Sequence, residues 1–205
     1  MAYPTVSAPY GLKPINRVDG LPYAGAIRQI PIASTYNTAI YNGDIVRIAA
    51  GGTIEKSTVT TDSTTAAANN TYGVFVGVAY TNSMSQPVEA QYYPGNSGVS
   101  NAVAYVVDDP MAAFKVAVVS GTTVIASVGR AVVGSNMALV QNAGNTTTGN
   151  SRVAISASTA TTNTLPVRIV DVVPETAQAA NPGNYTEVIV KWNFGMHQYE
   201  NATGV

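Results

Sequence analysis

The sequence predicts an all-β protein, and two observations support this prediction. Apolar, β-branched runs recur at roughly 8 to 12-residue spacing, and Gly, Pro, Asn or Asp residues separate them. No stretch has the length and apolar period of an amphipathic helix. A chain of 205 residues can form one β-sandwich or barrel domain, a domain with arms, or two small β modules.

The N-terminus predicts an extended arm, because Pro4, Pro9 and Pro14 stand among isolated apolar residues. We therefore assign residues 1–23 to the arm and residues 24–205 to a β-rich body with a C-terminal tail. Residues 1–19 are expected to lie against a neighbouring protein instead of folding back on their own body; the alternative is a disordered or self-packed terminus. The apolar side chains proposed to fill pockets on that neighbour are Val6, Tyr10, Leu12 and Ile15.

The first half of the body contains clear turn signals. Residues 27–33 predict an edge strand, since Pro31 interrupts the pattern. Asn42-Gly43 and Gly51-Gly52 predict two hairpin corners within residues 41–56. Residues 72–81 predict a strand whose two glycines, at 73 and 77, indicate a bulge or a close backbone approach. Residues 88–93 form a further strand, and the Ser/Thr-rich residues 57–71 predict an exposed loop.

The centre of the chain is Asp108-Asp109-Pro110, a sharp polar turn with apolar strands at residues 102–107 and 114–118 on either side. Beyond it, the expected strands are residues 123–127, 129–133, 138–141, 152–155, 166–173 and 186–192, and the expected polar loops are residues 142–151 and 156–164.

The composition indicates an assembling protein. Charged residues make up only 10% of the chain and the formal net charge is -1, so the surface must consist largely of neutral side chains suited to subunit contacts. We therefore expect a homo-oligomer, with a trimer as the expected number. The sequence has no cluster of Lys and Arg, so we expect no binding of nucleic acid. It also has no apolar run of the kind found in secretion signals or membrane spans, so we expect neither. The chain has no cysteine, so packing alone must hold the fold.

The sequence contains no evident reactive centre, which favours a structural protein over an enzyme. The single histidine, His197, has no Ser-His-Asp arrangement nearby, and the paired aspartates are explained by turn chemistry better than by a metal ion. We assign no catalytic, cofactor-binding or metal-binding residue. Tyr92 and Tyr93 should face opposite sides of a strand, so that one of them serves as an interface anchor or as a core residue.

Several segments together resemble the capsid decoration (cement) proteins of tailed bacteriophages, as found in marine and cyanobacterial phages. They are APYGLKPIN at residues 8–16, GDIVRIAAGGTIEK at 43–56 leading into YGVFVGVAY, VVDDPMAAFKV at 106–116 and NFGMHQY at 193–199. The resemblance implies a β-barrel or β-tulip-like body on the outer face of an icosahedral shell, often as a trimer. It implies the major capsid protein as partner, and a place on the virion after synthesis in the host cytoplasm.

A competing interpretation is a carbohydrate-binding or receptor-binding β module of a phage tail or adhesin. Such a module would use exposed aromatic side chains, for which Trp192 and Tyr199 are the candidates. The main shell protein is a weaker third interpretation, because that fold needs a long helix.

Overall fold

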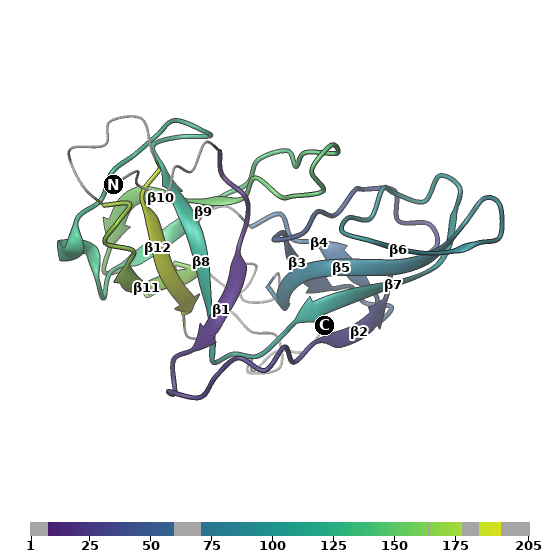
Figure 1. The fold of residues 1–205 in the computed structure, drawn as a ribbon, viewed down its shortest axis with the longest axis horizontal. Helices are drawn as coiled ribbons and strands as arrows, with labels where there is room; N and C mark the ends of the chain where they lie inside the picture. The colour runs from purple at the N-terminus through teal and green to yellow at the C-terminus, as the bar shows by residue number, and fades with distance from the viewer. Residues whose placement is uncertain (1–7, 60–70, 164, 178–184, 194–205) are drawn as a thin grey trace.

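The computed structural model describes residues 8–59, 71–163, 165–177 and 185–193. Within these ranges the chain forms twelve strands and one 3-10 turn, η1 (Arg130–Val132), arranged as two sheets (Figure 1). The all-β prediction is therefore confirmed. The same ranges hold no helix that is long and apolar enough to cross a membrane.

The first sheet closes into a five-stranded barrel, which confirms the barrel expectation. In order around the barrel the strands are β8 (Ala112–Val119), β10 (Ala154–Ala160), β9 (Asn136–Val140), β11 (Val167–Val172) and β12 (Glu187–Trp192), which pairs back with β8. The β8–β10 pair is parallel and the other pairs are antiparallel. Apolar side chains from these strands fill the barrel, so its core excludes water.

The second sheet has its own apolar core and lies beside the barrel (Figure 1). Its strand order is β2 (Arg28–Pro31), β7 (Val99–Val107), β5 (Gly73–Asn82), β3 (Ile45–Ile48) and β4 (Ile54–Lys56), with β6 (Pro87–Ala90) also paired to β5. A bridge between Ile32 and Ile54 brings the chain after β2 against β4. The edge-strand prediction is confirmed for β2, because β7 is its only strand partner among the described residues.

The prediction that residues 1–19 lie off their own body is wrong for the segment from Gly11 to Arg17. Strand β1 (Lys13–Arg17) pairs antiparallel with the first half of β8, and the fully buried Leu12 belongs to the barrel core. The physical reason is the short β8–β10 pairing, which begins only at Val118 and leaves the earlier part of that edge of β8 in need of a partner. Residues 1–7 lie outside the described residues.

The two apolar strands around the central polar turn are confirmed as β7 and β8, but they belong to different sheets. Residues 108–111 are therefore a connection between the sheets. Residues 18–27 make the same crossing beside them in the opposite direction, because β1 pairs with β8 while β2 pairs with β7. Two antiparallel connections thus join the barrel to the second sheet (Figure 1).

The glycine signals have different outcomes. Gly51-Gly52 forms the predicted hairpin between β3 and β4, whereas Asn42-Gly43 forms a turn without a hairpin. At the Asn42-Gly43 turn, Ile40 and Asn42 form bridges to distant segments instead of pairing across the turn. Gly43 has a φ of +95° and lies against Gly11. For β5 both expected features are present: the register shifts next to Gly77, and a Cβ on Gly73 would lie 2.4 Å from a β7 carbonyl oxygen.

Some strand and loop predictions in the remaining segments are wrong. Residues 123–127 and 129–133 form no strand, and the second of these contains η1. Residues 156–160, expected in a loop, continue strand β10, because the Ser/Thr-rich chain can pair with β9 without apolar alternation. For the expected loop at residues 57–71, the described Ser57, Val59 and Thr71 are buried, and residues 60–70 lie outside the described residues.

Candidate interaction surface

The sequence-predicted interface residues do not form one surface. Leu12, Tyr93 and Trp192 are core residues, with 0%, 1% and 4% exposure, and the Trp192 ring packs against Phe114 in the barrel. The large ring volume that suggested a surface anchor is instead used to fill a core. Val6 and Tyr199 lie outside the described residues.

The other three predicted interface residues, Tyr10, Tyr92 and Ile15, are partly accessible, and each makes different contacts. The Tyr10 hydroxyl donates a hydrogen bond to the buried Glu187, and burial, followed by this carboxylate, raises the pKa of Tyr10 far above its ordinary value. Tyr92 stacks on Tyr41 with ring centroids 5.4 Å apart. It is half-buried while Tyr93 is buried, which confirms that the neighbours face opposite ways. Ile15 is the most exposed of the three side chains, at 41%.

Ile15 is one of four exposed, large apolar side chains on or beside the two sheet connections. The others are Leu21 at 57%, Ile27 at 50% and Met111 at 38% exposure. We call this set, Ile15, Leu21, Ile27 and Met111, the crossover face. The segment of residues 21–27, which begins with Leu21 and ends with Ile27, contains no charged side chain, and all of it but Tyr23 is exposed.

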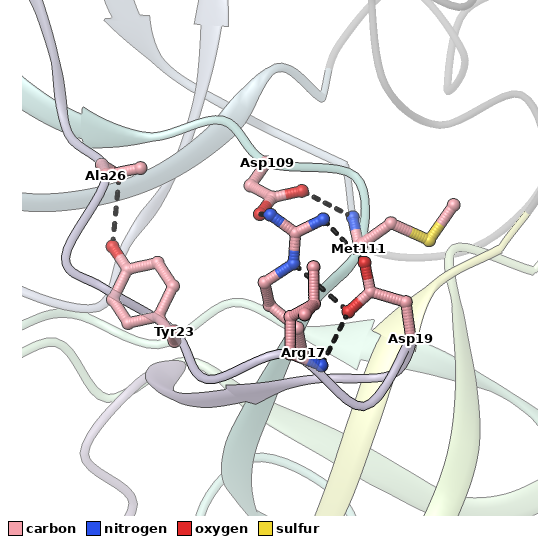
Figure 2. A network of polar contacts seen from close by, with 7 residues as sticks. Arg17, Asp19, Tyr23, Ala26, Asp109 and Met111 are labelled. Carbon is pink, nitrogen blue, oxygen red and sulfur yellow. Dashed lines mark hydrogen bonds and ion pairs between the residues drawn. The ribbon is translucent and has the colours of Figure 1, made fainter.

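A polar network fixes the backbone that carries the crossover face (Figure 2). The Arg17 guanidinium forms ion pairs with Asp19 at 2.6 Å and with Asp109 at 3.0 Å. It therefore joins the β1–β2 connection to the β7–β8 connection. Asp19 also accepts the amide of Leu21 at 3.1 Å, and the Tyr23 hydroxyl donates to the Ala26 carbonyl at 3.1 Å. The bonds within residues 17–26 are local, and the ion pair to Asp109 ties this loop to the second connection, so the loop is held in one conformation before any partner arrives.

The paired aspartates of the central turn have separate partners. Asp109 accepts the amide of Met111 at 2.8 Å, which confirms the interpretation that turn chemistry explains this corner. Asp108 accepts the Tyr72 hydroxyl at 2.7 Å and pairs with Arg28 at 2.6 Å. The hydrogen bond from Arg17 lowers the pKa of Asp19, so that carboxylate stays charged below its ordinary titration range. The charged side chains of the two connections, Asp19, Asp108 and Asp109, are thus each paired with an arginine of the chain.

A second polar cluster joins the barrel to the second sheet. The buried Asp44 accepts bonds from Lys56 at 2.9 Å and Ser151 at 2.6 Å. Lys13 donates to the side-chain oxygens of Asn42 and, at 3.0 Å, Asn150, and burial lowers the pKa of this lysine to about 8. These groups bind one another across the junction, so we assign the cluster a structural role.

The described surface also has an open depression of about 630 Å³ beside the β3–β4 hairpin. Its two charged lining residues, Arg47 and Glu55, pair with each other at 2.8 Å. This depression offers no convergent set of reactive groups that would argue for catalysis. Within the described ranges, no three His, Asp or Glu side chains are grouped so that they could hold a metal ion.

Sequence reasoning missed Leu21, Ile27 and Met111 as surface residues. Exposure depends on what packs over a side chain, and no local pattern reports that. One signal was available, namely the uncharged stretch LPYAGAI at residues 21–27, which is too irregular for a strand and too apolar for an ordinary loop.

Comparison of the chain with protein-family models, with curated proteins and with solved structures finds no significant match.

Proposed function

We propose that this chain is a structural virion protein that binds the outer surface of an icosahedral phage shell as a decoration, or cement, protein. In this proposal its partners are the major capsid protein and further copies of itself, expected as a trimer, and its location is the capsid surface. The observation that carries the proposal is the crossover face, whose exposed apolar side chains lie on or beside two connections that internal polar contacts hold in place.

The physical argument concerns what a permanent surface protein needs. Lasting attachment requires apolar area that becomes buried on contact, and a chain with only 10% charged residues has neutral side chains over much of its surface. A fixed loop loses little conformational entropy on binding, so more of the burial energy remains as affinity. The resemblance of the sequence segments to cement proteins supports the same proposal.

Mass spectrometry of purified particles tests the proposal directly. A cement protein should be present in a copy number comparable to that of the shell protein, whereas a tail module would be rare. Purified chain should also bind shells that lack it and raise the temperature at which they disrupt. A copy number far below that of the shell protein, together with no binding to such shells, would contradict the proposal.

The carbohydrate-binding alternative loses support from one of its two candidates. Trp192 is 4% exposed and packs against Phe114, so its ring has no free face for a sugar. The second candidate, Tyr199, lies outside the described residues. Retention of the purified chain on a glycan array would favour this alternative over the cement function.

A further inference from the structure

We propose that Lys13 and Asn150 are the two ends of an intramolecular isopeptide bond, which the folded chain forms by itself. In this bond the Lys13 Nζ takes the place of the side-chain nitrogen on the Asn150 Cγ. Lys13 begins the barrel edge strand β1, and Asn150 lies shortly before β10, so the bond joins residues 137 apart in sequence. The inference is independent of shell binding and assigns a modification site at the junction of the two sheets.

The first argument is the position of the Lys13 amine, which donates to amide oxygens. Its Nζ donates to the Asn150 Oδ1 at 3.0 Å, to the Asn42 Oδ1, and to the Asn42 backbone carbonyl at 3.4 Å. Because a C=O bond is about 1.2 Å long, a hydrogen bond to Oδ1 places Cγ roughly 3 to 4 Å from the donor. That separation is close to the distance of about 3–3.5 Å at which positioned groups react.

The second argument is that Lys13 can become a nucleophile. Only a neutral amine has a lone pair that can attack a carbonyl carbon, and burial lowers the pKa of Lys13 to about 8. The other charged side chains around this junction are paired among themselves, Asp44 with Lys56 and Lys115 with Glu187. The Lys13 amine therefore loses its proton at a mildly alkaline pH.

The third argument is the setting of the Asn150 carboxamide. Its Oδ1 accepts hydrogen bonds from the Lys13 Nζ and the Gln91 Nε2, both at 3.0 Å. When the amine attacks Cγ, negative charge develops on this oxygen, and the Gln91 amide stabilises it as an oxyanion-hole donor does. The Asn42 oxygens accept the N–H groups of the same amine, which leaves its lone pair for Asn150. Asn42 is thus the orienting residue and Asn150 the one attacked.

The reaction balances without an oxidant, a reductant or a cofactor. A bond forms between the Lys13 Nζ and the Asn150 Cγ, and the bond from Cγ to the Asn150 Nδ2 breaks. One proton of the amine passes through solvent to the leaving nitrogen, which departs as ammonia, and the Asn150 oxygen regains its double bond. The product is a secondary amide, and the chain becomes lighter by one ammonia, about 17 Da.

Mass spectrometry of the unaltered protein tests the inference. A fresh preparation kept at about pH 6 is the unreacted reference, and the same protein is then incubated at about pH 9, where most of the Lys13 amine is neutral. The intact mass should fall by about 17 Da. After cleavage with trypsin at Arg17, Arg130 and Arg152, the peptide of residues 1–17 should be joined to that of residues 131–152, which contains Asn150.

Three variants identify the roles of the side chains. Lys13→Arg keeps the positive charge but removes the nucleophile, so its mass should not change. The matched control is Lys115→Arg, at the position that lies beside Lys13 on β8, and this variant should react like the wild type. Gln91→Ala should slow the loss of ammonia at least about tenfold, because the Asn150 oxygen loses a donor. Its rate should keep the wild-type pH dependence, since the Lys13 amine is unaltered.

The peptide map of the wild-type chain decides the outcome even where a variant fails to fold. An intact mass that stays unchanged after incubation would overturn the inference. Loss of ammonia without a joined peptide, which indicates a succinimide at one asparagine, would also overturn it, as would a joint to the peptide of residues 29–47, which contains Asn42. A chain that forms the bond but does not bind shells would contradict the proposed function alone.

Discussion

Replacing Leu12 by Ala should destabilise the whole barrel, although the residue lies in a segment that the sequence assigns to an arm. Leu12 is completely buried in the barrel core, directly before the edge strand β1. The substitution removes about three buried carbon atoms. At about 0.8 kcal/mol per buried methylene, the lost transfer free energy is roughly 2.4 kcal/mol. The cavity left behind adds to this cost, so we expect a loss of about 3 kcal/mol in the free energy of unfolding.

Urea unfolding followed by tryptophan fluorescence measures this change, because Trp192 lies in the same core. The matched control is Ile15→Ala, three residues further on and 41% exposed, which should cost only about 1 kcal/mol since much of that side chain already contacts water. Equal unfolding free energies for the Leu12 and Ile15 variants would refute the placement of Leu12 in the core.

Deletion of residues 1–19 gives a second test of the same placement. A detached arm would leave the body with an unchanged melting temperature. We instead expect a lower melting temperature or failure to fold, because the deletion removes β1 and Leu12 and exposes the edge of β8. An unchanged melting temperature would show that the barrel is complete without this segment.

Three further predictions concern the junctions within the fold. Gly73→Ala should lower the free energy of unfolding in urea by about 1–3 kcal/mol, because the added Cβ would lie 2.4 Å from a backbone oxygen. Gly77→Ala should cost less, because the nearest atoms to its added Cβ are 3.4 Å away. Equal costs for the two variants would contradict this reasoning. Asp44→Asn should cost about 3 kcal/mol, because it leaves the half-buried Lys56 without its carboxylate. Arg130→Gln, at an exposed ion pair, should cost less than about 0.5 kcal/mol. Burial lowers the pKa of Lys13 from 10.5 to about 8, so below pH 8 the cost of the buried charge is fully present, and stability should rise as pH increases from about 8. The variant Lys13→Met should lack this rise, and identical pH profiles for the two proteins would contradict the assignment.

The turn predictions were confirmed where the residues of the turn and its neighbours decide the structure. The Gly51-Gly52 corner became a hairpin because two glycines and flanking β-formers are enough to close it. Asn42-Gly43 carries the same local signal, but its neighbouring residues pair with Tyr93 and Asn150, which are distant in sequence. At Asn42-Gly43, long-range pairing overrides the local turn preference. The sequence around the turn does not indicate those distant partners.

The candidate surface shows the same division. The sequence named Ile15 among its interface residues and indicated a neutral, assembling surface, yet it also named Leu12 and Trp192, which fill the core. Apolar side chains serve cores and interfaces through the same burial of surface, so composition cannot separate the two roles.

The sequence by itself determined the all-β class, most of the strand positions and the turn chemistry of the central aspartates, because alternation, β-branching and side-chain capping act over a few residues. Only the tertiary structure decided that β7 and β8 belong to different sheets, that the N-terminal segment completes the edge of β8, and that Leu21, Ile27 and Met111 lie exposed along the connections. These features depend on which distant strands pair and what then covers each side chain. Long-range pairing is governed by the fit of the whole chain, and no short stretch of sequence contains it.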